Sequence, residues 1–346
     1  MPTFTHIISV IDTHTAGEPT RIVLSSGLPP IPGDTMVEKK RYMMEHLDHI
    51  RTLLMHEPRG HKDMFGAIIT PPTTHRSQYG VLFINHTGYL DMCGHGTIGI
   101  TTALIETGMI PLTEPETVVA FDTPAGFVES HAKVEGGRVV EVSVANVSSF
   151  LFARDVELNI PEVGKITVDI SFGGNFFAMI PAKMLGVSVN PNNLSKLIQL
   201  GMSIKNTVNK KLKVVHPTQK HIAAVELTEI YDKPGPSKYY SKNVVIFGDG
   251  LVDRSPCGTG TSAAMAMLYG KGELPLDVEY INESIIGTKF KGKLVREVKV
   301  GHLVGADPII TGNAHITGFN HFVVDPNDPV KYGFVIGETS SLGSIN

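Results

Sequence analysis

Residues 92–99 read MCGHGTIG, and residues 256–263 repeat the same pattern as PCGTGTSA. Both stretches contain Cys-Gly-x-Gly-Thr followed by small and apolar residues. The two motif cysteines, Cys93 and Cys257, are the only cysteines of the chain and lie nearly half of its 346 residues apart. A pattern that recurs at this distance predicts a duplicated protein with one motif in each half.

Each motif has the same predicted local setting. Ahead of Cys93, residues 80–84 predict a strand and residues 88–90 a second short one, and residues 97–107 then predict a helix that ends near Gly108. Ahead of Cys257, residues 243–247 predict a strand, and residues 262–270 then predict a buried helix. Each cysteine is therefore expected at a strand-to-helix turn, close to a helix N-terminus.

The composition is that of a globular chain, with 42% hydrophobic and 18% charged residues. Further strands are predicted at residues 117–121, 139–144, 166–170, 222–227 and 294–300, and helices at 37–54 and from 191 to 205 or beyond. The mixture predicts a strand-rich α+β fold. We expect residues 1–125 to form the half that carries Cys93 and residues 126–319 the half that carries Cys257. Residues 320–346 are a candidate to rejoin the first half.

Charge and hydropathy argue against several classes of protein. The formal net charge is −4, and no basic stripe of the kind that binds nucleic acid is present. No run of about 18 apolar residues predicts a membrane span. The first ten residues lack the basic and apolar regions of a secretory signal. We expect a cytoplasmic protein that binds neither nucleic acid nor membrane.

A cysteine at a helix N-terminus meets unpaired backbone N–H groups and the positive end of the helix dipole. Both favour the thiolate, and such thiols can fall from a pKa of about 8.5 to roughly 3.5–7.5. The same N–H groups bind a carboxylate, and neighbouring glycines let a ligand approach the backbone. A thiolate and a thiol on opposite sides of one carbon can remove a proton from one face and deliver another to the opposite face. This chemistry is racemisation or epimerisation.

Three other interpretations of the cysteines are open at this point. Both can be inert buried residues, which is the common fate of a free cysteine. Cys93, His95 and Cys257 can form a metal site, although the spacing matches no usual motif and structural zinc needs four ligands. Cys93 and His95 can form a nucleophilic pair. That pair leaves Cys257 unexplained, and residues two apart at a helix start are not expected to face each other. We predict no metal.

The two cysteine motifs resemble those of the proline racemase family, and the second, DRSPCGTGTS at residues 253–262, is highly specific. Supporting blocks lie at residues 12–18, 57–61, 63–66, 171–174 and 317–320, so the resemblance covers nearly the whole chain. It runs closest to bacterial proline racemases. It implies a fold like that of diaminopimelate epimerase, with two pseudo-symmetric halves, each a curved sheet around a central helix, and the active site in the cleft between them. It also implies a homodimer and no cofactor.

The resemblance implies that Cys93 and Cys257 are the two catalytic residues. The substrate-binding positions that it implies are Gly94, His95, Gly258 and Thr259 for the carboxylate, Asp253 for the amine, and Phe65 and Phe247 for the ring. The residues alone are compatible with plainer roles as well. An Asp at this place often caps a turn or helix, and the two phenylalanines can be ordinary core residues.

The family includes proline racemases, 4-hydroxyproline 2-epimerases and trans-3-hydroxyproline dehydratases. Dehydratases of this type typically replace the second cysteine, which is present here as Cys257. The epimerases tend to carry a histidine at the position that we align with Leu227. An apolar side chain there cannot bond a substrate hydroxyl, so we predict racemisation of L- and D-proline. The alternatives are 4-hydroxyproline 2-epimerisation and, from another class, a non-catalytic proline-binding protein.

Overall fold

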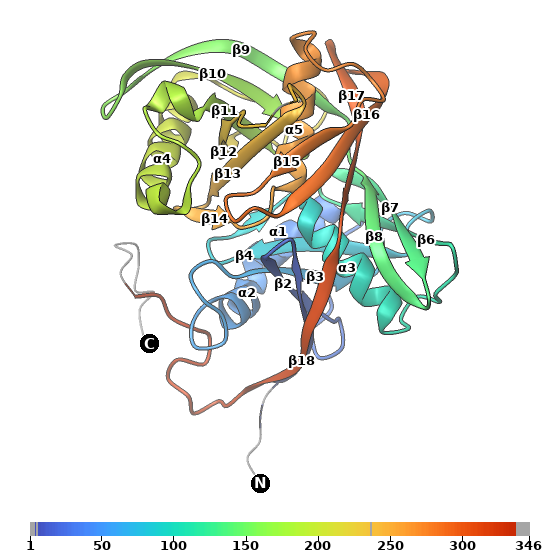
Figure 1. Ribbon diagram of the computed structural model, residues 1–346. Helices are drawn as coiled ribbons and strands as arrows, with labels where there is room; N and C mark the ends of the chain where they lie inside the picture. Colours follow the sequence, from blue (N-terminus) through green and yellow to red (C-terminus); the bar gives the residue numbers. More distant parts are fainter. Residues whose placement is uncertain (1–3, 5, 236, 337–346) are drawn as a thin grey trace.

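The computed structural model describes residues 4, 6–235 and 237–336, which form two halves of similar architecture (Figure 1). Each half is built around one helix that is almost completely buried. The first central helix is α3 (Gly94–Glu106), and the second is α5 (Gly258–Gly270). Both start directly after a motif cysteine, so the helices predicted there are confirmed. A helix that is apolar or small on all sides belongs in a protein interior.

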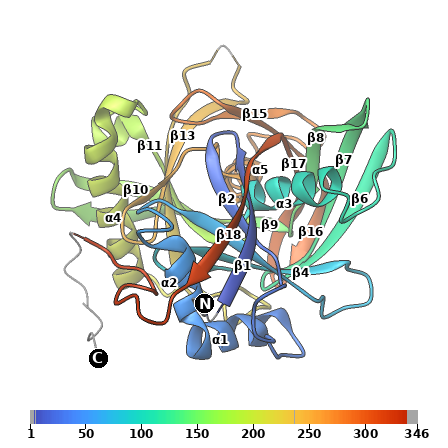
Figure 2. The same cartoon turned by 90° about the horizontal axis from the view of Figure 1, so that it is seen from below.

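The sheet of the first half curves around α3. Its strands, in order of pairing, are β18 (Ala314–Val324), β1 (His6–Thr15), β2 (Glu18–Val23), β3 (Phe65–Thr70), β4 (Tyr79–Asn85), β6 (Glu116–Thr123), β7 (Gly126–Glu135) and β8 (Arg138–Ala145). The pairs β2–β3 and β4–β6 are parallel and the others antiparallel. The short β5 (Tyr89–Leu90) forms a hairpin with β4 and leads into α3. From below, α3 lies between β1, β2 and β18 on one side and β6, β7 and β8 on the other (Figure 2).

The second half repeats this order of pairing around α5. Its strands are β9 (Ser149–Ile160), β10 (Gly164–Phe172), β11 (Phe176–Pro181), β12 (Val225–Asp232), β13 (Tyr240–Phe247), β15 (Tyr280–Glu283), β16 (Lys289–Val300) and β17 (Leu303–Gly312). Here β11–β12 and β13–β15 are the parallel pairs, and β14 (Leu251–Asp253) forms the hairpin with β13 that leads to the second cysteine. The duplication expected from the two motifs is confirmed.

The outer helices occur at equivalent places in the sequence of each half, between β2 and β3 in the first and between β11 and β12 in the second. In the first half they are α1 (Met36–His46) and α2 (Asp48–Met55), and in the second α4 (Leu194–Lys211), preceded by the short η1 (Ala182–Leu185) and η2 (Pro191–Asn193). The single helix predicted over residues 37–54 is wrong, because Leu47 leaves helical geometry at φ −127° and ψ 15°. Within the part of the chain that the structure describes, no helix has both the length and the apolar character needed to cross a membrane.

Most predicted strands lie within observed ones, at β4, β6, β8, β10, β13 and β16. The strand predicted at residues 222–227 is displaced, since β12 runs from Val225 to Asp232. Ile222 instead closes a turn, in which its N–H bonds the carbonyl of Gln219 and its carbonyl accepts from His216. Of the first three residues of the predicted strand, only Ile222 fills the core, and it does so from a loop, while Ala223 and Ala224 are exposed.

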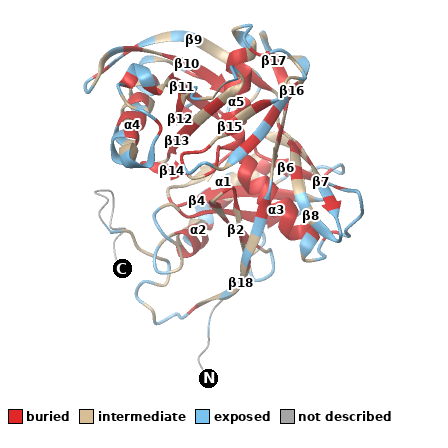
Figure 3. Ribbon diagram, in the orientation of Figure 1, coloured by how far each residue is buried: buried red, intermediate tan, exposed pale blue. Residues whose placement is uncertain are grey.

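The largest core of the protein extends from one half into the other. Buried residues cover both central helices and the sheet faces toward them (Figure 3). A second cluster lies beneath α1 and α2, on the outer side of the first sheet. The two central helices meet at their N-termini, so the cysteine motifs lie in the middle of the molecule.

The boundary predicted at residue 125 falls in a turn between two strands that pair with each other, since Thr123 of β6 faces Gly126 of β7. Both β7 and β8 contact α3. We therefore propose that the first half continues through β8 to residue 145 and includes β18, which pairs with β1. The second half then comprises residues 149–312. Residues 337–346 of the predicted C-terminal segment lie outside the described residues.

Candidate active site

Cys93 and Cys257 occupy the N-cap positions of the two central helices. The N–H of Gly96 donates to Cys93 Sγ at 3.2 Å, and the N–H of Gly260 donates to Cys257 Sγ at 3.3 Å. Each sulfur thus takes the place of the side-chain oxygen that normally caps a helix. The predicted location of both cysteines at helix N-termini is confirmed.

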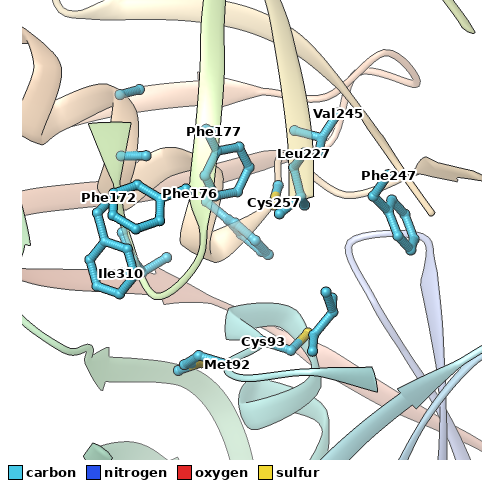
Figure 4. Close-up of a cluster of buried hydrophobic side chains, with 14 of the residues drawn as sticks. Met92, Cys93, Phe172, Phe176, Phe177, Leu227, Val245, Phe247, Cys257 and Ile310 are labelled. Atoms are coloured by element: carbon cyan, nitrogen blue, oxygen red, sulfur yellow. The ribbon is translucent and has the colours of Figure 1, made fainter. Parts of the chain in front are cut away.

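One small cavity lies between the two caps and has room for about one water molecule, at a volume of about 10 Å³. It is lined by Phe65, Leu90, Met92, Cys93, Gly94, His95, Leu227, Phe247, Asp253, Cys257 and Thr259. Cys93 and Met92 lie on one side, and Cys257, Leu227 and Phe247 on the other (Figure 4). Eight of the nine predicted site residues are therefore together. The ninth, Gly258, lies behind the lining, in backbone contact with Gly94.

Hydrogen bonds join the two halves around this cavity. The side-chain amide of Asn175 donates to the Met92 carbonyl at 2.8 Å, directly ahead of Cys93. On the other side, Glu18 Oε2 accepts from the backbone N–H of Arg254 at 2.7 Å. The Arg254 guanidinium in turn pairs with Asp63 at 2.7 Å. These contacts hold the two halves together around a cavity that, at about 10 Å³, is smaller than an amino acid.

His95 lies beside Cys93, with Nδ1 3.2 Å from Sγ. The expectation that these two residues do not face each other is wrong. Cys93 has extended backbone angles, φ −144° and ψ 117°, so its side chain folds back over the first turn of α3. Nδ1 of His95 is also 3.8 Å from Asp253 Oδ2, and its ring packs edge-on against Phe65. Burial lowers the pKa of His95, and the nearby Asp253 carboxylate opposes that shift.

The structure does not bear out the expected low pKa of the thiols. Burial raises the pKa of Cys93 well above its usual value, and the N–H of Gly96 offsets only part of this. Burial also raises the pKa of Cys257, and the carboxylate of Asp253 raises it further. Desolvation therefore outweighs the helix N-terminus in this closed site. Sequence patterns indicate where a helix starts but not how much water reaches it.

Asp253 presents one carboxylate oxygen to the cavity side. Its Oδ1 accepts from the N–H and the hydroxyl of Ser255, at 2.8 and 2.7 Å. Its Oδ2 faces His95. The fully buried Glu18 lies close by, and burial together with Asp253 raises its pKa well above the usual range. Glu18 was not predicted as a site residue, although it ends the DTHTAGE block that carries part of the family resemblance.

Leu227 and Phe247 form an apolar wall of the cavity. They face each other in the antiparallel ladder of β12 and β13. Both are almost completely buried, at 2% and 4% exposure. Neither side chain has a polar atom, so this wall offers no hydrogen bond to a ligand hydroxyl.

The described residues contain no group of three or more His, Cys, Asp and Glu side chains arranged to hold a metal ion. Cys93 and Cys257 are both free thiols. The chemistry that the geometry supports is proton transfer between two buried thiols, with His95 and Asp253 as polar neighbours.

Comparison with known proteins gives consistent relatives. The sequence model of the family described as Proline racemase matches residues 10–335. The chain is 53% identical to the proline racemase of Acetoanaerobium sticklandii, over 96% of this chain and 99% of the relative. It is 42% identical to a 4-hydroxyproline 2-epimerase of Streptosporangium roseum, over 95% and 98%. A crystal structure of an Agrobacterium vitis hydroxyproline epimerase with bound trans-4-hydroxy-L-proline superposes with a TM-score of 0.91 at 30% identity, covering 96% of each chain.

Proposed function

The chain belongs to the proline racemase family of amino-acid racemases and epimerases, and from this premise we propose that Cys93 and Cys257 interconvert L- and D-proline. The observation that carries the proposal is that the only two cysteines cap two opposed helices and line one cavity. A buried pair of thiols with a carboxylate and an imidazole beside it suits proton transfer at carbon.

In the proposed reaction, one cysteine is a thiolate and the other a thiol when proline binds. The thiolate takes the α-proton from one face of the ring, and the pair of electrons stays on the α-carbon and the adjacent carboxylate. The opposite thiol then gives its proton to the other face. The product leaves with inverted configuration, and the two sulfurs have exchanged roles. No other reactant is needed for the atoms and charges to balance.

The helix N-termini supply the binding groups for the carboxylate. Backbone N–H groups near Gly94 and Gly258, with the side chains of His95 and Thr259, lie next to the two sulfurs. Such donors favour the negative charge that builds up on the carboxylate as the α-proton leaves. We assign the ring to the wall formed by Phe65, Leu227 and Phe247.

We assign the substrate ammonium to Asp253. In the closed site, the Asp253 carboxylate contributes to raising the pKa of both thiols. A cation placed against this carboxylate offsets its charge and so lowers the pKa of the thiols toward the value at which a thiolate forms. Binding of the zwitterion therefore helps to prepare the base that acts on it.

The apolar wall favours proline over 4-hydroxyproline. A hydroxyl buried without a partner costs about 1–3 kcal/mol, and Leu227 offers it none. Dehydration of a 3-hydroxyproline is the less suitable reaction, because both thiols of a two-base site are present. Cofactor independence, assembly as a homodimer and a cytoplasmic location stay predictions.

The proposal is tested by following the optical rotation of L-proline and of trans-4-hydroxy-L-proline with the purified chain. We expect the rotation of L-proline to decay to zero, and kcat/KM for proline to exceed that for 4-hydroxyproline. The opposite preference would identify a 4-hydroxyproline epimerase. Binding of proline without any change in rotation would identify a non-catalytic binding protein.

A further inference from the structure

Glu229 is a buried glutamate on β12 that lies directly beneath the second catalytic motif. Its side chain has no exposure to solvent. A Cβ built on Gly260 would lie only 2.5 Å from Glu229 Oε2 and 3.2 Å from Cys257 Sγ. The N–H of the same glycine donates to that sulfur. The carboxyl therefore packs against the first turn of α5, and Gly260 lies between it and the Cys257 thiol.

The surroundings of Glu229 are short of hydrogen-bond donors. Within the described residues, neither carboxyl oxygen has a hydrogen-bond partner of good geometry, and the side-chain oxygens of neighbouring Asn243 and Asn282 accept no hydrogen bond. In this part of the structure, the amide groups of these two asparagines are the only donors near enough to act on the carboxylate, and they lower its pKa only in part. Both asparagines direct their amide N–H groups to the Pro256 carbonyl, at 2.8 and 3.3 Å. A protonated Glu229 supplies an O–H to this group of acceptors, whereas an ionised one adds a buried charge that no cation neutralises and that the two asparagine amides offset only in part.

The first half has no such carboxyl at the matching place. There, a Cβ on Gly96 would meet the ring of Phe83 at 3.0 Å. The two cysteine backbones differ as well. Cys93 is extended, whereas Cys257 has φ +63°, a left-handed value that is uncommon for a residue with a side chain. Strain of this kind persists only where the surroundings fix it, and the two asparagines fix the peptide just ahead of Cys257.

We propose that Glu229 is a positioning residue that makes the two thiols unequal: neutral Glu229 permits the thiolate on Cys257, and ionised Glu229 shifts it to Cys93. The inference rests on the proposed role of the two cysteines. The titratable groups that interact with Glu229 are Cys257, Asp253, Tyr231 and Tyr280, and no cation is among them.

The electrostatics agree with this geometry. Burial raises the pKa of Glu229 to about 8, and the Asp253 carboxylate adds to the rise. The Glu229 charge contributes to raising the pKa of Cys257, while the nearby carboxylates that act on Cys93 are Asp253 and Glu18. Ionisation of Glu229 thus falls within the pH range in which a racemase is assayed, and it acts on one thiol.

Turnover alone does not reveal this asymmetry. The two enantiomers of proline have equal free energy, so the equilibrium constant is one and kcat/KM must be equal in both directions at every pH. The thiols have to be compared directly. Brief labelling with iodoacetamide, followed by peptide mass spectrometry, gives the ratio of alkylated Cys257 to alkylated Cys93, because only the thiolate reacts.

The experiment compares this ratio from pH 6 to 9.5 in the unmodified chain, in Glu229→Gln and in Glu226→Gln. Glu226 is a half-buried glutamate whose pKa burial also raises, three residues away on β12 and therefore on its opposite face. We expect the ratio to fall about tenfold through pH 8 in the unmodified chain and in Glu226→Gln, the equivalent of one pKa unit. In Glu229→Gln this fall should be absent.

A ratio that changes equally with pH in all three proteins would overturn the proposal. If Glu229→Gln does not fold, the unmodified chain still tests the proposal. A ratio of alkylated Cys257 to alkylated Cys93 that stays constant from pH 6 to 9.5 contradicts a titrating group beside one thiol. The labelling needs no turnover. A chain that labels as expected but does not invert proline therefore refutes the proposed function and not the inequality of the thiols.

Discussion

A methyl group placed on Gly94 would lie 2.6 Å from the α-carbon of Gly258, closer than real side-chain contacts allow. The N-termini of α3 and α5 therefore meet end to end through two glycines. This contact brings both sets of unpaired N–H groups to one small volume, together with the two capping sulfurs. The duplicated fold thus creates a single site that neither half contains alone.

Gly94→Ala should separate the two halves at this contact. We expect a loss of about 1–3 kcal/mol in the free energy of unfolding from overpacking. Racemisation should fall at least about 100-fold, since a displacement of about 1 Å can cost that much. The matched control is Gly88→Ala, where an added methyl group meets nothing within 4 Å. Denaturant unfolding and polarimetry measure both effects, and an unaltered rate in Gly94→Ala would show that the closed contact is not part of the active form.

Leu227→His should change the substrate preference. A histidine in the apolar wall supplies a partner for a ring hydroxyl, whose unpaired cost is about 1–3 kcal/mol. The ratio of kcat/KM for 4-hydroxyproline to that for proline should rise by about 5- to 150-fold. Leu227→Met, which keeps the wall apolar, should leave the ratio close to that of the unmodified chain. Equal ratios in both variants would remove Leu227 from the determinants of specificity.

Asp253→Asn should make both thiols more acidic and weaken proline binding. The Asp253 carboxylate raises the pKa of Cys93 and of Cys257, so its loss lowers both values. Alkylation should then proceed faster at a given pH, while KM for proline rises because the ammonium loses its partner. Asp249→Asn, at an exposed turn nearby, serves as the control. Slower alkylation in Asp253→Asn would contradict the direction of the electrostatic effect.

Glu229→Gln should alter how stability depends on pH. Glu229 has a pKa of about 8 in the folded chain, against 4.5 as its ordinary value. The folded state therefore keeps a proton that the unfolded state releases. The stabilisation from this proton is complete below about pH 4.5 and is lost as pH rises through 8. Between pH 5 and 9, urea unfolding should show a loss about 3–5 kcal/mol larger in the unmodified chain than in Glu229→Gln. Equal losses would place the carboxyl in contact with solvent.

The sequence alone was sufficient for the duplicated plan and for the position of both cysteines. The repeated motif located the two central helices, because a glycine-rich turn followed by small and apolar residues predicts a buried helix. The family resemblance indicated most of the residues that line the cavity, including Leu227, but not Leu90 or Met92.

Other features depend on tertiary structure. Nothing in residues 37–54 marks a helix break, which lies at Leu47, where the backbone leaves helical geometry between α1 and α2. The high pKa of both thiols follows from burial, which local patterns do not report. No local sequence pattern distinguishes Glu18 or Glu229, because only the packed fold shows that each is buried with at least one carboxyl oxygen unpartnered.

Two thiols that act on opposite faces of one α-carbon leave a distinct isotope pattern. It is measured by incubating the chain with L-proline in deuterium oxide and analysing both enantiomers at early times. We predict deuterium at the α-carbon of the D-proline formed and almost none in the remaining L-proline, because the proton removed and the proton delivered belong to different sulfurs. Equal deuterium in both enantiomers from the start, or D-proline that retains the original proton, would contradict it.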